Sequence, residues 1–280
     1  MKDFGAETNW ASTEIGNDFW VYKGGSVGEM YGYKSDGRYE VSDFQGYDQS
    51  AEEWILNEGV ADNSSVIGEI RPGSMKLKDI TGDGNVTIDD RTIIGNANPK
   101  HTGGMVLSGR IYGFDLSAVF SWSYGNDIYN ANKMQFTSSS KYQYRNMIDI
   151  MEDGKRWTNI DAAGEVVNDP LQLEEMNKNT TMWSPYMKRY AFSDWAVEDG
   201  SFLRLNTLTL GYRLPSSLLE KLRITNLRFY TTCYNVFTIT DYSGYNPEVS
   251  TRRKTALTPG VDYSAYPKSR QFIFGMNLNF

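Results

Sequence analysis

The sequence predicts an all-β protein, namely a portion of an antiparallel transmembrane β-barrel with long extracellular loops. Three observations lead to this fold class: segments in which apolar and polar residues alternate, a composition both polar and aromatic-rich, and long connections that alternate with short ones. The mean hydropathy is −0.52, while 14% of the residues are aromatic. Such a chain suits a barrel with one apolar face, one wet face and aromatic girdles. A secreted carbohydrate-binding sandwich would have a similar composition, so composition leaves both folds open.

Membrane-spanning helices are excluded because no stretch approaches the roughly 18 apolar residues that one needs. A barrel strand needs only about 9–11 alternating residues. The start, residues 1–5, has no apolar h-region, so no signal peptide is visible. We therefore expect the chain to be either soluble or part of a longer outer-membrane protein.

Two short strands are expected near the amino end, at 18–23 and 29–34, with Gly24 and Gly25 between them. A longer hairpin is expected at 104–124, where apolar residues recur at every second position on both sides of a short turn. Gly113 gives this turn the permissive backbone that a tight hairpin needs.

Two further strands are expected at 201–212 and 226–238, with less regular alternation. Between them Leu214-Pro215-Ser216-Ser217 starts a turn, and residues 218–222 are expected to form one helical turn.

The final strand is the clearest one. Within 271–280 the apolar residues fall on one face and mostly small or polar ones on the other. The apolar set is Phe272, Phe274, Met276, Leu278 and Phe280. In a barrel we expect outward side chains such as Phe120, Trp122, Phe272 and Phe274 to contact lipid.

The connections differ sharply in length. Residues 35–103, 125–200 and 239–269 are long and polar, whereas the connections near 112–114 and 213–225 are short. Counted back from the carboxy end, every long connection falls on the same side, as in an outer-membrane barrel. A sandwich has no reason to sort its loops in this way.

A helix is also expected at 144–153, inside the second long connection. Four loop aromatics could stack on sugars, although packing within the loop explains them better: Tyr142, Tyr144, Trp157 and Trp183.

Residues 79–90 fit a 12-residue calcium loop within one of the long loops. The ligand positions of such a loop are filled by oxygen-bearing residues, and Gly84 stands at the turn position. The candidate ligands are Asp79, Thr81, Asp83, Asn85 through its carbonyl, Thr87 and Asp90. Thr81 is a poorer ligand than Asp, and Asp90 is shorter than the usual Glu. The other interpretation is an Asp/Gly-rich turn held by side-chain-to-backbone hydrogen bonds. A bound Ca²⁺ would brace the loop.

The sequence contains too few residues of the types that catalytic sites use. The chain has one histidine, His101, and one cysteine, Cys233, so a zinc site or a Cys–His pair has too few members. Adjacent acids such as Glu174-Glu175 in a polar loop are typical of solvated surface. The net charge of −7 argues against nucleic-acid binding. We therefore expect no enzyme, and Cys233 is interpreted as a small packing residue.

Six segments, in order over roughly residues 20–280, resemble SusC/RagA-type TonB-linked outer-membrane transporters. They are 28–37; 79–99; 112–117 with 125–130; 197–205 with 208–215; 235–240 with 245–248; and Tyr266-Pro267 before the last strand. Members of that family end in a strand with a terminal aromatic residue, as Phe280 is here.

The resemblance implies that residues 1–280 are the carboxy-terminal part of a 22-stranded TonB-dependent receptor barrel, without the plug domain and the first strands. About six to eight strands are expected. The implied activity is TonB-dependent import of oligosaccharides or peptides across the Gram-negative outer membrane. The implied partners are a SusD-like surface lipoprotein, TonB acting through the plug, the glycan or peptide substrate, and outer-membrane lipid.

Two other interpretations stay open. One is a soluble, calcium-braced carbohydrate-binding β module, in which the apolar strand faces would meet a core. The other is a surface adhesion protein, for which no internal repeat is evident.

Overall fold

The computed structural model describes residues 8–10, 18–139, 144–186, 189, 191–220, 223–251 and 256–280. The chain divides into two compact units. The sheet unit contains residues 97–128, 199–249 and 264–280, and the loop unit contains 1–96, 129–198 and 250–263. No helix in the described ranges is long and apolar enough to cross a membrane.

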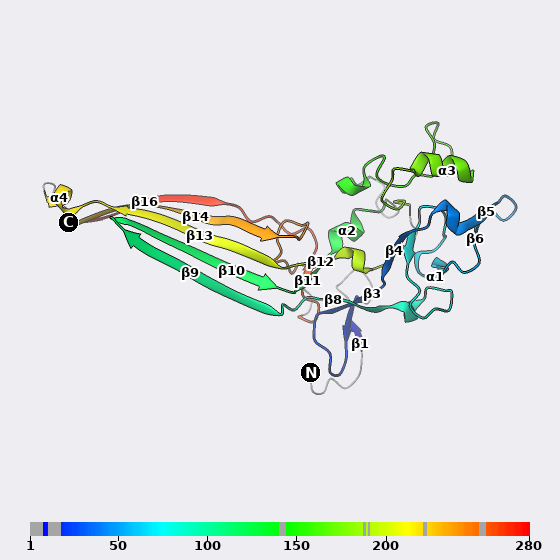
Figure 1. The fold of residues 1–280 in the computed structure, drawn as a ribbon, viewed down its shortest axis with the longest axis horizontal. Coiled ribbons are helices and arrows are strands. Elements are labelled where there is room, and N and C mark those ends of the chain that lie inside the picture. The colour runs from blue at the N-terminus through cyan, green and yellow to red at the C-terminus, as the bar shows by residue number, and fades with distance from the viewer. Residues whose placement is uncertain are drawn as a thin grey trace. The chain divides into compact units, whose positions relative to one another are not determined.

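The sheet unit is built on long antiparallel strands in the order β16-β14-β13-β10-β9 (Figure 1). Their bounds are β9 His101–Ile111, β10 Phe114–Tyr124, β13 Phe202–Arg213, β14 Asn226–Thr240 and β16 Gln271–Asn279. These strands confirm the antiparallel fold class. The expected six to eight strands were too many for this sheet, which has five in the described part of the chain.

The predicted hairpin at 104–124 is confirmed as β9 and β10. Its turn consists of Tyr112 and Gly113, with φ angles of 47° and 83°. Positive φ at both central residues is typical of a two-residue hairpin turn whose backbone twist matches the twist of the paired strands. Ile111 and Phe114 are therefore directly paired, and the register continues without a break to His101 opposite Tyr124.

The irregular alternation in 201–212 has a structural cause. In β13 the register shifts between Leu205 and Thr207, which leaves Asn206 without a partner opposite it on β10. This bulge moves the apolar positions from the odd numbers, such as Leu205, to the even ones, such as Leu208. Asn235 in β14 lies beside the same irregularity and has φ 51°.

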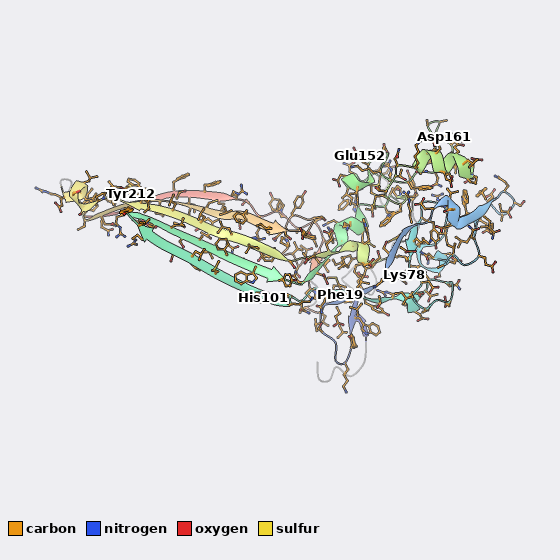
Figure 2. All side chains as sticks on the ribbon, viewed as in Figure 1. Phe19, Lys78, His101, Glu152, Asp161 and Tyr212 are labelled. Atoms are coloured by element: carbon orange, nitrogen blue, oxygen red, sulfur yellow. The ribbon has the colours of Figure 1, made fainter. Side chains whose placement is uncertain are left out.

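All long connections leave one end of the sheet, as predicted. At that end Tyr124 pairs with His101, and Ser123 pairs with Phe202. At the other end the chain turns at 112–113 and at 214–225, where helix α4 (Ser216–Leu219) lies. Figure 2 shows His101 and Tyr212 at opposite ends of the strands. The helical turn was predicted at 218–222, of which 221 and 222 lie outside the described residues. It begins two residues earlier, directly after Pro215, which is its N-cap residue.

The loop unit shows that the long connections contain short elements of their own. In the amino-terminal part these are β1 Thr8–Trp10, β2 Phe19–Val21, β3 Glu29–Gly32, β4 Ser35–Arg38, η1 Val41–Asp43, β5 Phe44–Asp48, β6 Glu53–Leu56, α1 Ser64–Ile67, β7 Met75–Leu77, η2 Ile88–Asp90 and β8 Thr92–Asn96. Later come α2 Ala131–Gln135, η3 Asp149–Met151, α3 Pro170–Asn177, η4 Asp194–Ala196 and β15 Val261–Asp262. Strands β11 Asp127–Asn130 and β12 Val197–Asp199 cross the unit boundaries.

The two predicted amino-end strands exist as β2 and β3, and Phe19 pairs with Met30. They belong to the sheet β1-β2-β3-β8 of the loop unit. They are short, as predicted, and they lie outside the long sheet, which is why that sheet has fewer strands than the predicted six to eight.

The predicted helix at 144–153 is wrong. The structure has a single 3₁₀ turn there, Asp149–Met151. The amide of Ile148 donates to the carbonyl of Phe136, a tertiary bond that a continuous helix would not make. Met151 is 1% exposed and packs into a hydrophobic cluster, so tertiary packing decides the backbone of this segment.

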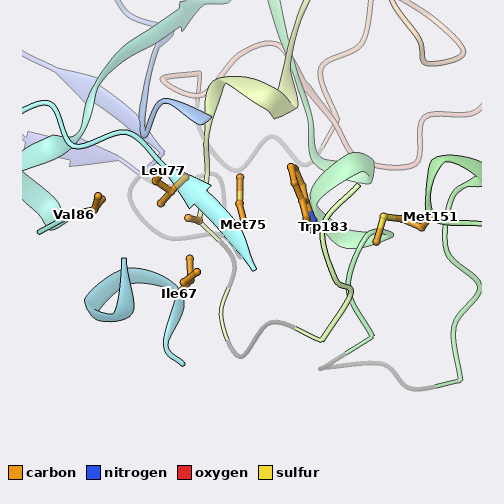
Figure 3. Packing of buried hydrophobic residues seen from close by; sticks show 7 residues of the cluster. Ile67, Met75, Leu77, Val86, Met151 and Trp183 are labelled. Atoms are coloured by element: carbon orange, nitrogen blue, oxygen red, sulfur yellow. The ribbon is translucent and has the colours of Figure 1, made fainter. Parts of the chain in front are cut away.

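Two apolar clusters hold the loop unit together. The first contains Ile67, Met75, Leu77, Val86, Met151, Trp183 and Ala191 (Figure 3). The second contains Tyr39, Val41, Phe44, Trp54, Trp157, Val167 and Leu173. Each draws side chains from segments far apart in the sequence, so burial of these side chains is what orders the long connections.

Candidate functional site

The long sheet has one apolar face. Side chains of directly paired residues lie on the same face of a sheet, so the register sorts them without ambiguity. One face contains Met105, Leu107, Ile111, Phe114, Leu116, Phe120, Trp122, Leu203, Leu205, Leu208, Leu210, Tyr212, Leu227, Phe229, Cys233, Phe237, Ile239, Phe272, Phe274, Met276 and Leu278. Several are largely exposed, for example Phe274 at 80%. The four residues expected to face lipid all lie on this face, as does Cys233.

The opposite face is polar and internally hydrogen-bonded. The hydroxyls of Thr209 and Thr232 lie 2.9 Å apart, and Asn206 Nδ2 donates to Ser121 Oγ over 2.8 Å. A sheet in a soluble sandwich would bury its apolar face, whereas here the apolar face is open and the polar face carries the specific contacts.

An ion pair crosses three strands on the polar face. Arg228 on β14 donates from Nε and Nη2 to the two carboxylate oxygens of Asp115 on β10, over 2.8 and 2.5 Å. Strand β13 runs between them, and Gly211 is the residue at the crossing. A Cβ on Gly211 would lie 2.4 Å from Arg228 Nη2 and 2.6 Å from Asp115 Oδ1. Glycine is thus required here by close approach.

A second polar cluster lies near the end with the long connections. Arg204 on β13 is 4% exposed, and its guanidinium contacts Thr238, Asn246 and Glu248. Sequence reasoning missed this cluster. Arg204 and Glu248 both lie within the segments that resemble the family. A charged arginine in an otherwise apolar strand was the feature of the sequence that could have indicated a buried ion pair.

The calcium-loop-like segment 79–90 is organised around Asp90. Its Oδ1 accepts hydrogen bonds from the amides of Ile80 and Thr81, and its Oδ2 accepts one from the amide of Thr87 at 2.7 Å. Asp79 accepts in the same way from the amides of Gly82 and Gly84. These bonds are those of an Asp/Gly-rich turn, and they hold the loop closed.

The environment of Asp90 strongly favours its ionised form. Burial by itself raises the pKa of this carboxyl, but the amides of Thr81, Thr87 and Ile80 outweigh burial and lower the pKa to about 2. Asp90 is fully buried, so these bonds are shielded from water.

Only some of the predicted calcium ligands converge. Thr81 Oγ1 lies 3.1 Å from Asp79 Oδ1 and 3.0 Å from Asp90 Oδ1, and Thr87 also contacts Asp90. Asp83 and Asn85 bond to each other and are exposed. Within the described ranges no group of three His, Cys, Asp or Glu side chains is placed to hold a metal. The converging oxygens are hard donors, the type that Ca²⁺ prefers.

The four aromatic residues of the loops differ in burial. Trp157 and Trp183 are buried at 2% and 4% exposure, so packing explains them. The guanidinium of Arg38 covers the Trp157 ring at 4.7 Å, and Gly73 lies against the same ring. Tyr144 is fully exposed. Tyr142 lies outside the described residues.

The fold and these features define a class of protein. An antiparallel sheet with an open apolar face, a hydrogen-bonded polar face and all long connections at one end is a section of a transmembrane β-barrel wall.

Comparisons with known proteins agree. No family model matches the chain. TonB-dependent receptor P3 of Formosa agariphila is 29% identical over 262 residues, which are 92% of this chain and 22% of the receptor. Receptor P39 of the same organism is 29% identical over 282 residues, covering 93% and 26%. TonB-dependent receptor SusC of Bacteroides thetaiotaomicron is 33% identical over 89 residues, which are 31% of this chain and 8% of SusC.

Solved structures show the same fold. The RagAB peptide transporter matches with a TM-score of 0.65 at 22% identity, covering 99% of this chain and 25% of the transporter chain. The RagAB peptide importer in its closed-closed state matches with a TM-score of 0.59. These relatives and structures bear out the resemblance to TonB-dependent receptors of the SusC/RagA type. The chain spans about a quarter of the length of the relatives that it matches over most of its own length. These relatives are receptors and transporters, in agreement with the absence of a catalytic motif.

Proposed function

We propose that this chain forms wall and extracellular loops of an importer that takes up oligosaccharides or peptides across the Gram-negative outer membrane, with energy from TonB. The two-faced sheet carries the proposal. Its apolar face, with Phe274 80% exposed, fits lipid, and its polar face fits the interior of a barrel. The names of the relatives support the dependence on TonB.

The proposal includes a partner at the external mouth, a SusD-like surface lipoprotein. Support comes from the fold match to the RagAB transporter. The loop unit supplies folded elements with buried cores rather than bare linkers, and preformed elements suit a docking surface because little order is lost on binding.

Uptake in cells tests the proposed function. A strain deleted for the complete gene and a complemented strain are given fluorescent oligosaccharides or fluorescent oligopeptides, each with and without a protonophore. We expect complementation to restore uptake of one class, and the protonophore to abolish it. Equal uptake of both classes in the two strains would contradict the proposal. Recovery of the natural protein in the soluble fraction without detergent would favour the calcium-braced carbohydrate-binding module.

We also propose that residues 79–90 bind Ca²⁺, with Asp79, Thr81, Asp83, Asn85, Thr87 and Asp90 as candidate ligands. The convergence of Asp79, Thr81 and Asp90 supports this proposal. The ion would brace the loop and take no part in chemistry.

Terbium luminescence with calcium competition tests the site. Asp83→Asn is the sharpest variant, because among the described residues the Asp83 carboxylate accepts from the nearby Asn85 amide and takes no part in the bonds around Asp90. We expect at least about tenfold weaker calcium binding in Asp83→Asn, since ligand charge sets affinity in such loops. The matched control is Asp36→Asn, an exposed aspartate of the loop unit outside the segment. Equal affinity in both variants would remove Asp83 from the ligands, and terbium luminescence of the natural protein that calcium does not displace would leave only the hydrogen-bonded turn.

A further inference from the structure

The connection between β14 and β16 leaves the sheet unit and returns to it. Its first leg, 241–249, and its last leg, 264–270, belong to the sheet unit, whereas 250–263 belongs to the loop unit. The legs meet in a small apolar cluster: Tyr242 and Val249 are buried with Ile128, and Ala265 packs against them. The points of departure and return are therefore neighbours in the fold.

Arg204 ties the first leg to the sheet. Its Nε donates to Thr238 Oγ1 over 2.8 Å, and its Nη2 donates to Asn246 Oδ1 over 2.7 Å. Its Nη1 forms an ion pair with Glu248. A guanidinium presents its donors in a fixed planar fork, so three acceptors in these directions determine where the leg lies. At 4% exposure the charge of Arg204 requires a counter-charge, which Glu248 supplies.

Glu248 ties the second leg to the first. Its Oε2 accepts from Lys268 Nζ over 2.5 Å as well as from Arg204. Partial burial alone raises the pKa of Glu248, but Lys268 and Arg204 outweigh it and lower the pKa. One carboxylate thus joins a strand residue and both legs. The Asn246 side chain also accepts from the Glu248 amide at 3.3 Å, which turns the leg toward Arg204.

We propose that Arg204, Asn246, Glu248 and Lys268 form a clasp that fixes both legs of the connection at the rim of the sheet. Its part in an importer rests on the proposed function: the clasp would make these residues positioning residues for an extracellular element at the mouth. The element would leave and return at fixed points, rather than swing as a free loop.

Hydrogen–deuterium exchange of the complete natural protein in detergent tests the clasp. Glu248→Gln keeps the size of the side chain and removes its charge, and Lys268→Gln removes the other leg's tie. Both side chains are partly exposed, at 38% and 46%, so both variants should fold. We expect Glu248→Gln to raise exchange at least about tenfold in both legs, and Lys268→Gln to raise it by a similar factor in the second leg, whose tie it removes; this factor corresponds to one charge-assisted hydrogen bond. Amides within β13 and β14 should exchange as in the natural protein.

The control is Glu220→Gln, which removes an exposed carboxylate beside α4 at the other end of the sheet. Arg204→Lys keeps the ion pair but loses the fork, so its exchange should lie between those of the natural protein and Glu248→Gln. Exchange in Glu248→Gln within twofold of the control would overturn the clasp. So would an increase in Glu248→Gln that is confined to the first leg.

Uptake measured on the same variants separates this inference from the proposed function. Exchange reports the clasp whether or not the protein imports anything. Failure of the natural protein to import would overturn the proposed function and leave the exchange result standing.

Discussion

Asp90→Asn should open the segment 79–90 locally without unfolding the protein. In the folded state the pKa of Asp90 is about 2, against an ordinary value of 3.8. That difference corresponds to about 2.5 kcal/mol in favour of the charged carboxylate. Because the folded pKa is the lower one, this stabilisation is fully present above pH 3.8 and is lost as the pH falls through 2. Asparagine removes it at neutral pH and turns an N–H group toward donors that need an acceptor.

Native-state proteolysis measures the effect. Trypsin cuts after lysine and arginine, and Lys78 and Arg91 flank the segment. The amide of Lys78 donates to the Lys34 carbonyl and that of Arg91 to the Ile88 carbonyl, so we expect cleavage at these sites to follow local opening. A loss of about 2.5 kcal/mol should raise the cleavage rate roughly 60-fold if cleavage follows the open population. EDTA is present throughout, so that bound calcium does not mask the change.

Asp89→Asn is the matched control, because the neighbouring Asp89 is exposed. It should be cleaved at the rate of the natural protein. Equal cleavage of the two variants would refute the reasoning, since it would mean that the hydrogen bonds to the Asp90 carboxylate do not hold the segment closed.

Three further substitutions test other parts of the fold. Phe274→Lys on the apolar face should destabilise the membrane-inserted protein by about 2–4 kcal/mol, measured by urea unfolding in vesicles, whereas Asn277→Lys on the polar face should cost far less; equal costs would mean that the faces are wrongly assigned. Gly211→Ala should separate Arg228 from Asp115 and lower the free energy of unfolding by about 1–3 kcal/mol. In a variant that already lacks the ion pair, the same substitution should lower it little further; additive losses in thermal unfolding would contradict this. Trp157→Ala should cost about 3–5 kcal/mol and loosen the loop unit, seen as faster proteolysis there; unchanged proteolysis would refute the core assignment.

The loop unit explains how long polar connections can be ordered. Segments 35–103 and 125–200 are polar on average, yet the first contributes the buried Trp54 and the second contributes the buried Trp157 and Trp183. Each buried aromatic side chain contributes substantial apolar burial. A loop with its own cores loses less conformational entropy when a partner docks, which fits the proposed contact with a surface lipoprotein.

The alternation of Phe272, Phe274, Met276 and Leu278 was sufficient to predict a strand and its apolar face, because side-chain direction in a strand follows from sequence parity alone. Gly113 was likewise sufficient to place the hairpin, since few residues adopt positive φ. These are local properties, and the structure confirms them. The lengths of the connections were also sufficient to predict that all long connections leave the same end of the sheet.

Other features depended on residues that meet only in the folded chain. The parity change at Asn206 is readable as a bulge only when the partner strand is known. The helix expected at 144–153 failed because Met151 is held by a distant apolar cluster. Arg204 and Glu248 are separated by 44 residues, and no local pattern pairs them. Sequence parity and turn chemistry determined the sheet, whereas long-range burial and charge pairing, which act between segments distant in the chain, decided the loops and the clasp.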